Sequence, residues 1–201
     1  MKRIAVLISN KGKGTNLQAI IDAVESGLIP AKIVVVVSDA EDAYGVKRAK
    51  KHQLKVEICP KKEDLLSILN KYDPAYIALA GWKQIILDET IDAFPNRILN
   101  VHPGLIPDSV NSTVAAPDGT QALWNKGKFT KKAIQNFLDQ KSTYAGSTIH
   151  FLSKEFDFGP VLKRGFVKVH KNDTIDSLYE RLKKEEHKMY IESLQKLCQP
   201  E

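Results

Sequence analysis

Cysteine is scarce in this chain of 201 residues, which contains only Cys59 and Cys198. The two lie far apart, and their spacing matches no metal-ligand pattern. A disulfide framework and a metal site are therefore not expected, and the reducing cytoplasm is the expected compartment.

Long hydrophobic runs are also missing, since no run approaches the roughly 20 apolar residues that a membrane helix requires. The N-terminal MKRIAVLIS places two basic residues before an apolar run, as signal peptides do. The run is short, however, lacks a small-residue cleavage site and continues into a Gly/Lys loop. We expect it to form the first β-strand of one ordinary domain that is not embedded in a membrane.

Acidic residues are fewer than basic ones, which gives a net charge of +6 and a pI near 9.1. Lys and Arg cluster at 47–52, 126–132 and 181–188, but stacking aromatic residues are not interleaved with them. A basic face that gathers an anionic small molecule is the preferred interpretation, and nucleic acid is not expected as the main partner.

The first hundred residues alternate between two patterns. Short β-branched runs, typical of strands, occupy 3–9, 32–39, 54–59, 76–81 and 97–102. Helical patterns long enough for crossovers lie between them, at 15–27, 43–52, 62–72 and 87–94. This alternation predicts an α/β fold with a Rossmann-like, doubly wound, mostly parallel sheet and helices on both faces.

The pattern changes after Pro107. Residues 108–119 form a polar loop, and 120–127 and 130–140 look helical. Strands are predicted again at 147–152 and 161–169, followed by a last helix from about Thr174 to Leu197.

The loop 9-SNKGKGTNLQAI-20 follows the first predicted strand, and Thr15 or Asn16 is a candidate cap of the next helix. The N–H groups and positive dipole end of a helix start suit a phosphate, and glycines allow close approach. The G-x-G-x-x-G motif fails at Leu17, and the P-loop spacing is missing, so neither a dinucleotide nor ATP is indicated. A plain glycine turn is the alternative.

Asn100 and His102 end the strand run 97-RILNVH-102 and, two residues apart, point to the same side of an extended chain. A hydrated strand end turned by Pro103 and Gly104 is the simplest interpretation. Asp157, before Gly159, is by itself a typical turn former. Together, however, Asn offers a donor to an oxyanion, His transfers a proton and Asp orients the His. Without a serine elbow motif, direct attack of an amine on a carbonyl-level carbon fits best.

The chain resembles the folate-dependent formyltransferases. The resemblance rests on 6-VLISNKGKGTNLQAIIDA-23, 78-ALAGW-82, 99-LNVHPGLIP-107, 155-EFDFGPV-161 and 185-EEH-187, in the order of the family. The N-x-H-P-x-L-x-P signature marks the wider family, whereas the first loop and E-E-H point to the branch that acts on glycinamide ribonucleotide.

The resemblance implies transfer of a formyl group from 10-formyltetrahydrofolate to the amine of 5-phosphoribosylglycinamide, in purine biosynthesis. Asn100 and His102 would polarise the formyl group, and Asp157 would assist proton transfer. The residues implied in binding the phosphorylated substrate are Gly14, Thr15, Asn16, Lys61, Lys62, Val101, Pro103 and Glu186. Those implied in binding the folate are Trp82, Lys83, Gln84, Ile85, Ile86, His150, Leu152 and Phe156.

Some features depart from the family. Lys61 or Lys62 stands where the family has a phosphate-binding Arg, and Lys lacks the bidentate fork. After Pro107 the family usually has a short basic or aromatic segment, a Gly and then a His, but 108–123 contains no His or Arg. The segment 124–145 that follows reads as a long insertion. We therefore expect a single formyltransferase domain with a phosphate-binding half, 1–100, and a catalytic and folate-binding half, 101–201, that carries an insertion at 108–145.

Several alternatives remain open. The acceptor could be another small amine, such as an amino-sugar nucleotide, or methionyl-tRNA, although the extra C-terminal domain used for tRNA is not expected here. Hydrolysis of formyltetrahydrofolate is a third possibility, and a non-catalytic nucleotide-binding module is a fourth. Glu186 alone reads as a solvated helix charge, and His150 alone as an ordinary strand residue. A monomer or a homodimer is expected.

Overall fold

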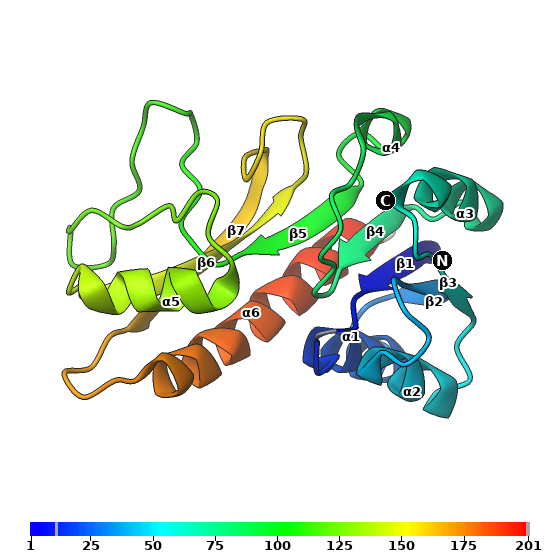
Figure 1. Ribbon diagram of the computed structural model, residues 1–201, viewed down its shortest axis with the longest axis horizontal. Coiled ribbons are helices and arrows are strands. Elements are labelled where there is room, and N and C mark those ends of the chain that lie inside the picture. Colours follow the sequence, from blue (N-terminus) through cyan, green and yellow to red (C-terminus); the bar gives the residue numbers. More distant parts are fainter. Residues whose placement is uncertain (11, 200–201) are drawn as a thin grey trace. The chain divides into compact units, whose positions relative to one another are not determined.

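The computed structural model describes residues 1–10 and 12–199, and the chain divides into two compact units. The first comprises Met1–Asn100 with the chain from Leu194, and the second comprises Val101–Ser193. Lys11, within the predicted anion loop, lies outside the described residues. Figure 1 labels the helices and strands of both units.

The first unit is built from alternating strands and helices. Its strands are β1 (Lys2–Ile8), β2 (Ala31–Ser38), β3 (Val56–Ile58), β4 (Tyr76–Leu79) and most of β5 (Ile98–His102). Its helices are α1 (Thr15–Glu25), α2 (Tyr44–Lys51), the 3₁₀ turn η1 (Lys62–Asp64), α3 (Leu65–Tyr72) and α4 (Asp88–Ala93). The strands pair in parallel, β1 with β2 and β4, β2 with β3, and β4 with β5.

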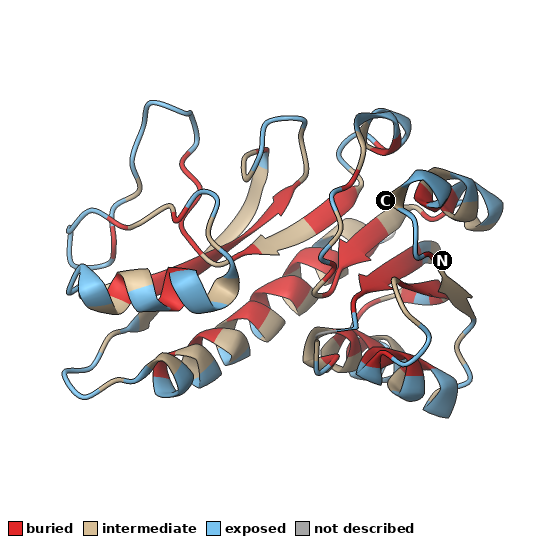
Figure 2. Ribbon diagram, in the orientation of Figure 1, coloured by how far each residue is buried: buried red, intermediate tan, exposed pale blue. Residues whose placement is uncertain are grey.

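Burial explains why β1 forms the centre of this unit. Ile4–Ile8 are buried without interruption, so the strand is apolar toward both faces of the sheet (Figure 2). Such continuous apolar strands are typical of parallel sheets covered by helices on both sides. Gly45 of α2 allows close packing here, because a Cβ at Gly45 would lie 2.5 Å from Cδ1 of Ile8.

The second unit contains the end of β5, α5 (Thr130–Asp139), β6 (Tyr144–Phe151), β7 (Val161–Lys168) and most of α6 (Ile175–Cys198). Strands β6 and β7 pair antiparallel, with an irregularity between Ile149 and His150. The core of this unit joins buried residues of α5, β6 and α6 with residues of the preceding loops: Leu105, Ala116, Ala122, Ile134, Phe137, Ala145, Leu178 and Leu182.

The seven strands are hydrogen-bonded in the order β3-β2-β1-β4-β5-β6-β7. The predicted α/β class and mostly parallel sheet are therefore confirmed. Within the described residues, no helix is long and apolar enough to cross a membrane.

The helix predicted at 120–127 is wrong. This segment is extended: Gln121 forms a bridge with Ala115, and the carbonyl of Leu123 accepts a hydrogen bond from the N–H of Leu105 at 2.9 Å. The apolar residues 122–124 fit a helical pattern, but long-range pairing of the main chain decides the conformation. Helix α5 does follow at Thr130, as predicted, and its residues Ala133, Ile134 and Phe137 are buried.

Candidate active site

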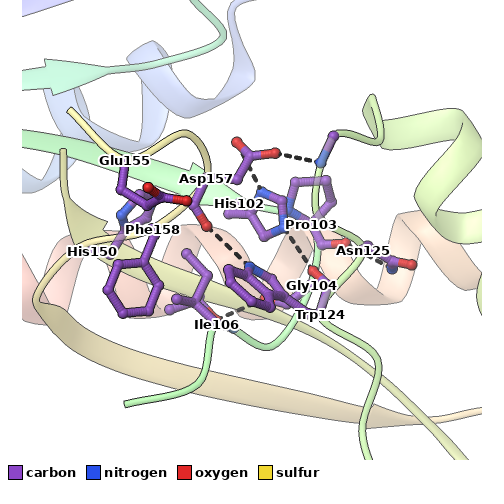
Figure 3. A network of polar contacts seen from close by, with 12 residues as sticks. His102, Pro103, Gly104, Ile106, Trp124, Asn125, His150, Glu155, Asp157 and Phe158 are labelled. Carbon is purple, nitrogen blue, oxygen red and sulfur yellow. Dashed lines mark hydrogen bonds and ion pairs between the residues drawn. The ribbon is translucent and has the colours of Figure 1, made fainter. Parts of the chain in front are cut away.

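His102, the last residue of β5, is buried in the second unit, and both of its ring nitrogens face protein oxygens. Nε2 lies 2.7 Å from the carbonyl oxygen of Trp124, and Nδ1 lies 3.5 Å from Oδ1 of Asp157 (Figure 3). A carbonyl only accepts hydrogen bonds, so Nε2 carries a proton in this arrangement. Asn100 lies two residues earlier on the same strand and is half-buried.

Asp157 is held through both its main chain and its carboxylate. Its φ of 50° lies in the left-handed region, which Asp tolerates better than most residues. The N–H of Gly127 donates to Oδ2 at 2.7 Å, and the indole N–H of Trp124 donates to the Asp157 carbonyl at 3.0 Å. Burial by itself would raise the pKa of Asp157, but hydrogen bonding to His102 and the charge of that ring bring the pKa below its usual range.

Trp124 lies close to the turn after β5 because Gly104 has no side chain. A Cβ at Gly104 would lie 1.8 Å from the carbonyl oxygen of Trp124. The turn after His102 is fixed from its other side by the buried Thr148, whose hydroxyl donates to the Gly104 carbonyl at 2.7 Å and accepts from the N–H of Ile106 at 3.0 Å.

His150 of β6 is fully buried, and its Nδ1 donates to the carbonyl of Phe151 at 3.0 Å. Burial, followed by the charge of His102, lowers the pKa of His150 to about 4. This ring is therefore neutral at physiological pH. It lies in the same group of side chains as His102 and Asp157 (Figure 3).

Glu186 of α6 is not a solvated helix charge. It is only 5% exposed, and its Oε1 accepts a hydrogen bond from the hydroxyl of Ser147 at 2.7 Å. Burial raises the pKa of Glu186 to about 7, although the Ser147 hydroxyl and the charges of Lys183 and His102 oppose that rise.

In the first unit, α1 begins at Thr15 with Gly14 at the cap position, and no side-chain hydrogen bond caps it. The prediction that Thr15 or Asn16 caps this helix is therefore wrong. No acidic residue lies in the first turn, so the dipole end stays positive, as an anion site requires. Arg48 braces the loop, because its Nε donates to the carbonyl of Lys13 at 3.1 Å and its Nη1 to Oε1 of Gln18 at 3.0 Å.

Lys61 and Lys62, assigned to the substrate, lie beside Gln84 and Ile85, assigned to the folate. All four line one surface hollow of about 420 Å³. The Gln84 amide donates to the carbonyl of Pro60 at 3.1 Å, which ties the segment after β4 to the segment before η1. The structure thus brings together, within the first unit, residues that the sequence divided between two ligands.

The other residues assigned to the folate differ in exposure. Trp82 and Ile86 are buried, Ile85 is 65% exposed, and the N–H of Lys83 donates to the hydroxyl of Ser9 at 2.8 Å. In the second unit, Phe156 is 62% exposed and Leu152 is half-buried. Val101 and Pro103, assigned to the substrate, are half-buried on either side of His102.

Sequence reasoning missed Trp124, Gly127, Ser147 and Thr148. Trp124 and Gly127 lay within the segment predicted as a helix, and Trp124 contacts His102 through its main-chain carbonyl, which every residue has. A signal was nevertheless present, because 124-WNKGKF-129 combines aromatic and basic residues with a glycine, as the segment after Pro107 usually does in the family.

Comparison with known proteins shows to which family the chain belongs. The sequence model of the family described as formyl transferase matches residues 2–194. The chain belongs to this family. The resemblance to the formyltransferases is therefore confirmed, and no group of three metal-ligating side chains occurs within residues 1–10 and 12–199.

Individual relatives have a common name. Phosphoribosylglycinamide formyltransferase of Haemophilus influenzae is 33% identical over 94% of this chain and 84% of that protein. The chloroplastic enzymes of the same name from Arabidopsis thaliana and Vigna unguiculata are 32% and 30% identical, and this chain spans 66% and 61% of their length, less than two thirds. The crystal structure of glycinamide ribonucleotide transformylase 1 from Symbiobacterium toebii matches with a TM-score of 0.81 and 34% identity, over 97% of this chain and 86% of that one.

Proposed function

We propose that the protein transfers the formyl group of 10-formyltetrahydrofolate to the amine of 5-phosphoribosylglycinamide. The observation that carries the proposal is the contact of half-buried Asp157 with buried His102, which ends β5 two residues after Asn100. Relatives named for this reaction and matching over nearly the whole chain support the choice of acceptor.

In the reaction, the amine nitrogen attacks the formyl carbon and a tetrahedral oxyanion forms. The Asn100 amide and a His102 N–H stabilise that oxyanion in this proposal. Breakdown of the intermediate breaks the bond from carbon to N10 of the folate, and the proton lost by the amine passes to N10. Asp157 is ionised at neutral pH and relays this proton, either directly or through a water.

The two His102 nitrogens are not equivalent in this role. The Nε2–H is committed to the Trp124 carbonyl at 2.7 Å, whereas the Nδ1 contact with Asp157 is longer, 3.5 Å. Nδ1 is therefore the nitrogen that exchanges a proton with Asp157, or donates to a substrate oxygen beside the pair.

Substrate binding uses other residues. The uncapped start of α1, with Gly14, Thr15 and Asn16, takes the phosphate, and Glu186 accepts hydrogen bonds from the ribose hydroxyls. Lys61 and Lys62 add positive charge for an anionic group of either ligand, because the hollow they line also contains residues assigned to the folate. The folate is bound by the remaining residues assigned to it above.

Incubation of the protein with 10-formyltetrahydrofolate and a panel of phosphorylated amines tests the proposal. We expect formylated 5-phosphoribosylglycinamide and stoichiometric release of tetrahydrofolate. Faster transfer to an amino-sugar nucleotide would replace the acceptor, and release of formate without acceptor would indicate a hydrolase. Absence of both reactions, with nucleotide binding retained, would indicate a binding module.

We further propose that the protein acts in the cytoplasm, on small molecules and without a metal, as a monomer or a homodimer. Light scattering of the purified protein would measure its mass, and activity that survives treatment with a chelator would support the metal-free reaction.

A further inference from the structure

Trp124 makes one hydrogen bond with each member of the His102–Asp157 pair. Its carbonyl oxygen accepts from Nε2 of His102 at 2.7 Å, and its indole N–H donates to the carbonyl of Asp157 at 3.0 Å. Figure 3 shows the indole beneath the pair, with its nitrogen pointing to the Asp157 main chain. One side chain and its own main chain therefore join the end of β5 to the turn that carries Asp157.

Neighbouring contacts hold Trp124 in place. The buried Asn125 adopts a φ of 59°, its amide donates to the carbonyl of Pro103 at 3.1 Å, and its Oδ1 accepts from Asn136 at 2.7 Å. The Trp124 ring packs against Phe158, with 5.8 Å between the ring centroids. The segment is thus fixed by buried polar contacts, which are costly to break.

The outer side of the ring is covered by a charge. Nζ of Lys126 lies 4.9 Å from the Trp124 ring and 2.6 Å from a carboxylate oxygen of Glu155. Both partners of this ion pair are more than a third exposed, so it contributes little to stability by itself.

The contacts of Trp124 determine what the pair presents to a substrate. The carbonyl fixes the orientation of the His102 ring and keeps a proton on Nε2, so Nδ1 faces Asp157. The indole N–H holds the main chain of Asp157 in its left-handed conformation, which sets the direction of the carboxylate. The charged or titratable groups that face this carboxylate are His102 of β5 and His150 of β6, and Glu155 lies two residues earlier.

We propose that Trp124 is a positioning residue, whose indole N–H keeps the Asp157 carboxylate directed at Nδ1 of His102. This role rests on the proposed formyl transfer. Trp124 does not touch the reacting atoms in this scheme, and it acts through Asp157.

Trp124→Phe tests the role, because it keeps an aromatic ring and the main-chain carbonyl but removes the indole N–H. We expect kcat to fall about tenfold, the effect of one lost hydrogen bond, with both KM values within about twofold of wild type. The acid limb of the kcat profile should move to higher pH, because an Asp157 carboxylate less well directed at His102 is protonated more easily.

Lys126→Ala is the matched control, since it removes the outer contact of the same ring and leaves the indole N–H. Its kcat should stay within about twofold of wild type. An equal loss in both variants would mean that general packing of the segment matters, and would overturn the proposal. Wild-type kcat and an unshifted acid limb in Trp124→Phe would overturn it as well.

A measurement that does not depend on activity tests the positioning role of Trp124 separately from the proposed reaction. The Asp157 carboxyl can be titrated by ¹³C NMR, with the signal assigned by Asp157→Asn. We expect its pKa to be higher in Trp124→Phe than in wild type and in Lys126→Ala, even if the acceptor proves to be another amine. Equal titration in all three proteins would refute the positioning role whatever the reaction is.

Should Trp124→Phe fail to fold, hydrogen exchange in the native protein decides. Trp82→Phe leaves one indole signal, that of Trp124. If its N–H is bonded to Asp157, it should exchange at least about tenfold more slowly than a free indole. Exchange at the free rate would overturn the proposal.

Discussion

Replacement of Glu186 by Gln should make the free energy of unfolding depend less on pH. Glu186 is buried, and its pKa is raised from 4.5 to about 7, chiefly by burial. Gln keeps the shape and an oxygen that accepts the Ser147 hydroxyl, but it does not ionise. The variant therefore isolates the cost of placing a negative charge at this position.

The direction of the pKa shift determines whether the free energy of unfolding rises or falls with pH. Below pH 4.5, Glu186 is protonated in both the folded and the unfolded protein, so ionisation has no effect on stability. Between pH 4.5 and 7, the folded protein keeps the proton and the unfolded chain releases it, so the free energy of unfolding falls as pH rises. Since each pKa unit is about 1.36 kcal/mol, the full cost above pH 7 is about 3 kcal/mol.

The assay is urea denaturation of wild type and Glu186→Gln between pH 4 and 8, followed by circular dichroism. The difference in the free energy of unfolding between the two proteins should change in favour of the variant by about 3 kcal/mol over this range. Other titrating groups are common to both proteins and cancel. Glu185→Gln is the matched control, because it makes the same substitution one residue earlier on α6, at a position that is only half-buried.

Two results would refute this reasoning. A difference between wild type and Glu186→Gln that is constant with pH would mean that burial does not raise the pKa of Glu186. A change in the opposite direction would mean that the folded state prefers the carboxylate. Ser147→Ala gives an independent check, because loss of the donor should cost about 1 kcal/mol more at pH 8 than at pH 5, where the carboxyl is neutral.

Further predictions concern catalysis and binding. Asn100→Ala and His102→Ala should each lower kcat roughly 10²-fold with the fold intact, and a near-normal kcat at saturating folate would contradict their roles. Gly14→Val introduces a side chain at φ 67°, where a Cβ lies 3.0 Å from Cα of Gly45. It should raise KM for the phosphorylated amine more than KM for folate, and equal rises would show that the loop does not select the amine. Shortening of 108–118 should increase folate hydrolysis relative to transfer, if this loop excludes water; a constant ratio in a folded variant would exclude that role.

The strands and most helices were predictable because their signals are local. The uninterrupted apolar run of β1 and the helical period of α6 depend only on neighbouring residues, and both elements lie within two residues of their predicted bounds. The alternating direction of side chains along an extended strand also predicted that Asn100 and His102 point to one side of β5. Gly159 indicated a turn at Asp157 from the sequence alone. The structure shows why a glycine is needed there, because a Cβ at Gly159 would lie 2.1 Å from the carbonyl oxygen of Phe151.

Long-range contacts account for what the sequence did not predict. Glu186 reads as a surface charge on a helix, and only its contact with Ser147, 39 residues away, shows that it is buried. Trp124 and Ala122 fit a helix by spacing, yet the chain there is extended because Leu123 pairs with Leu105. Neither the burial of Glu186 nor the extended chain at Trp124 can be predicted from neighbouring residues alone.

The segment between Pro107 and Trp124 belongs to the part in which the sequence departs from its family, and the structure shows how its two ends are held near His102. At its start, Arg164 of β7 donates to the carbonyl of Ile106 at 2.8 Å and to Asp108 at 2.7 Å. At its end, Leu123 is bonded to Leu105, one residue beyond the Gly104 that admits the Trp124 carbonyl. Both ends of the loop are therefore fixed at the site independently of the chain between them. Since the entropy of closing a loop grows only slowly with its length, residues can be gained or lost here at little cost while the His102–Asp157 geometry is kept.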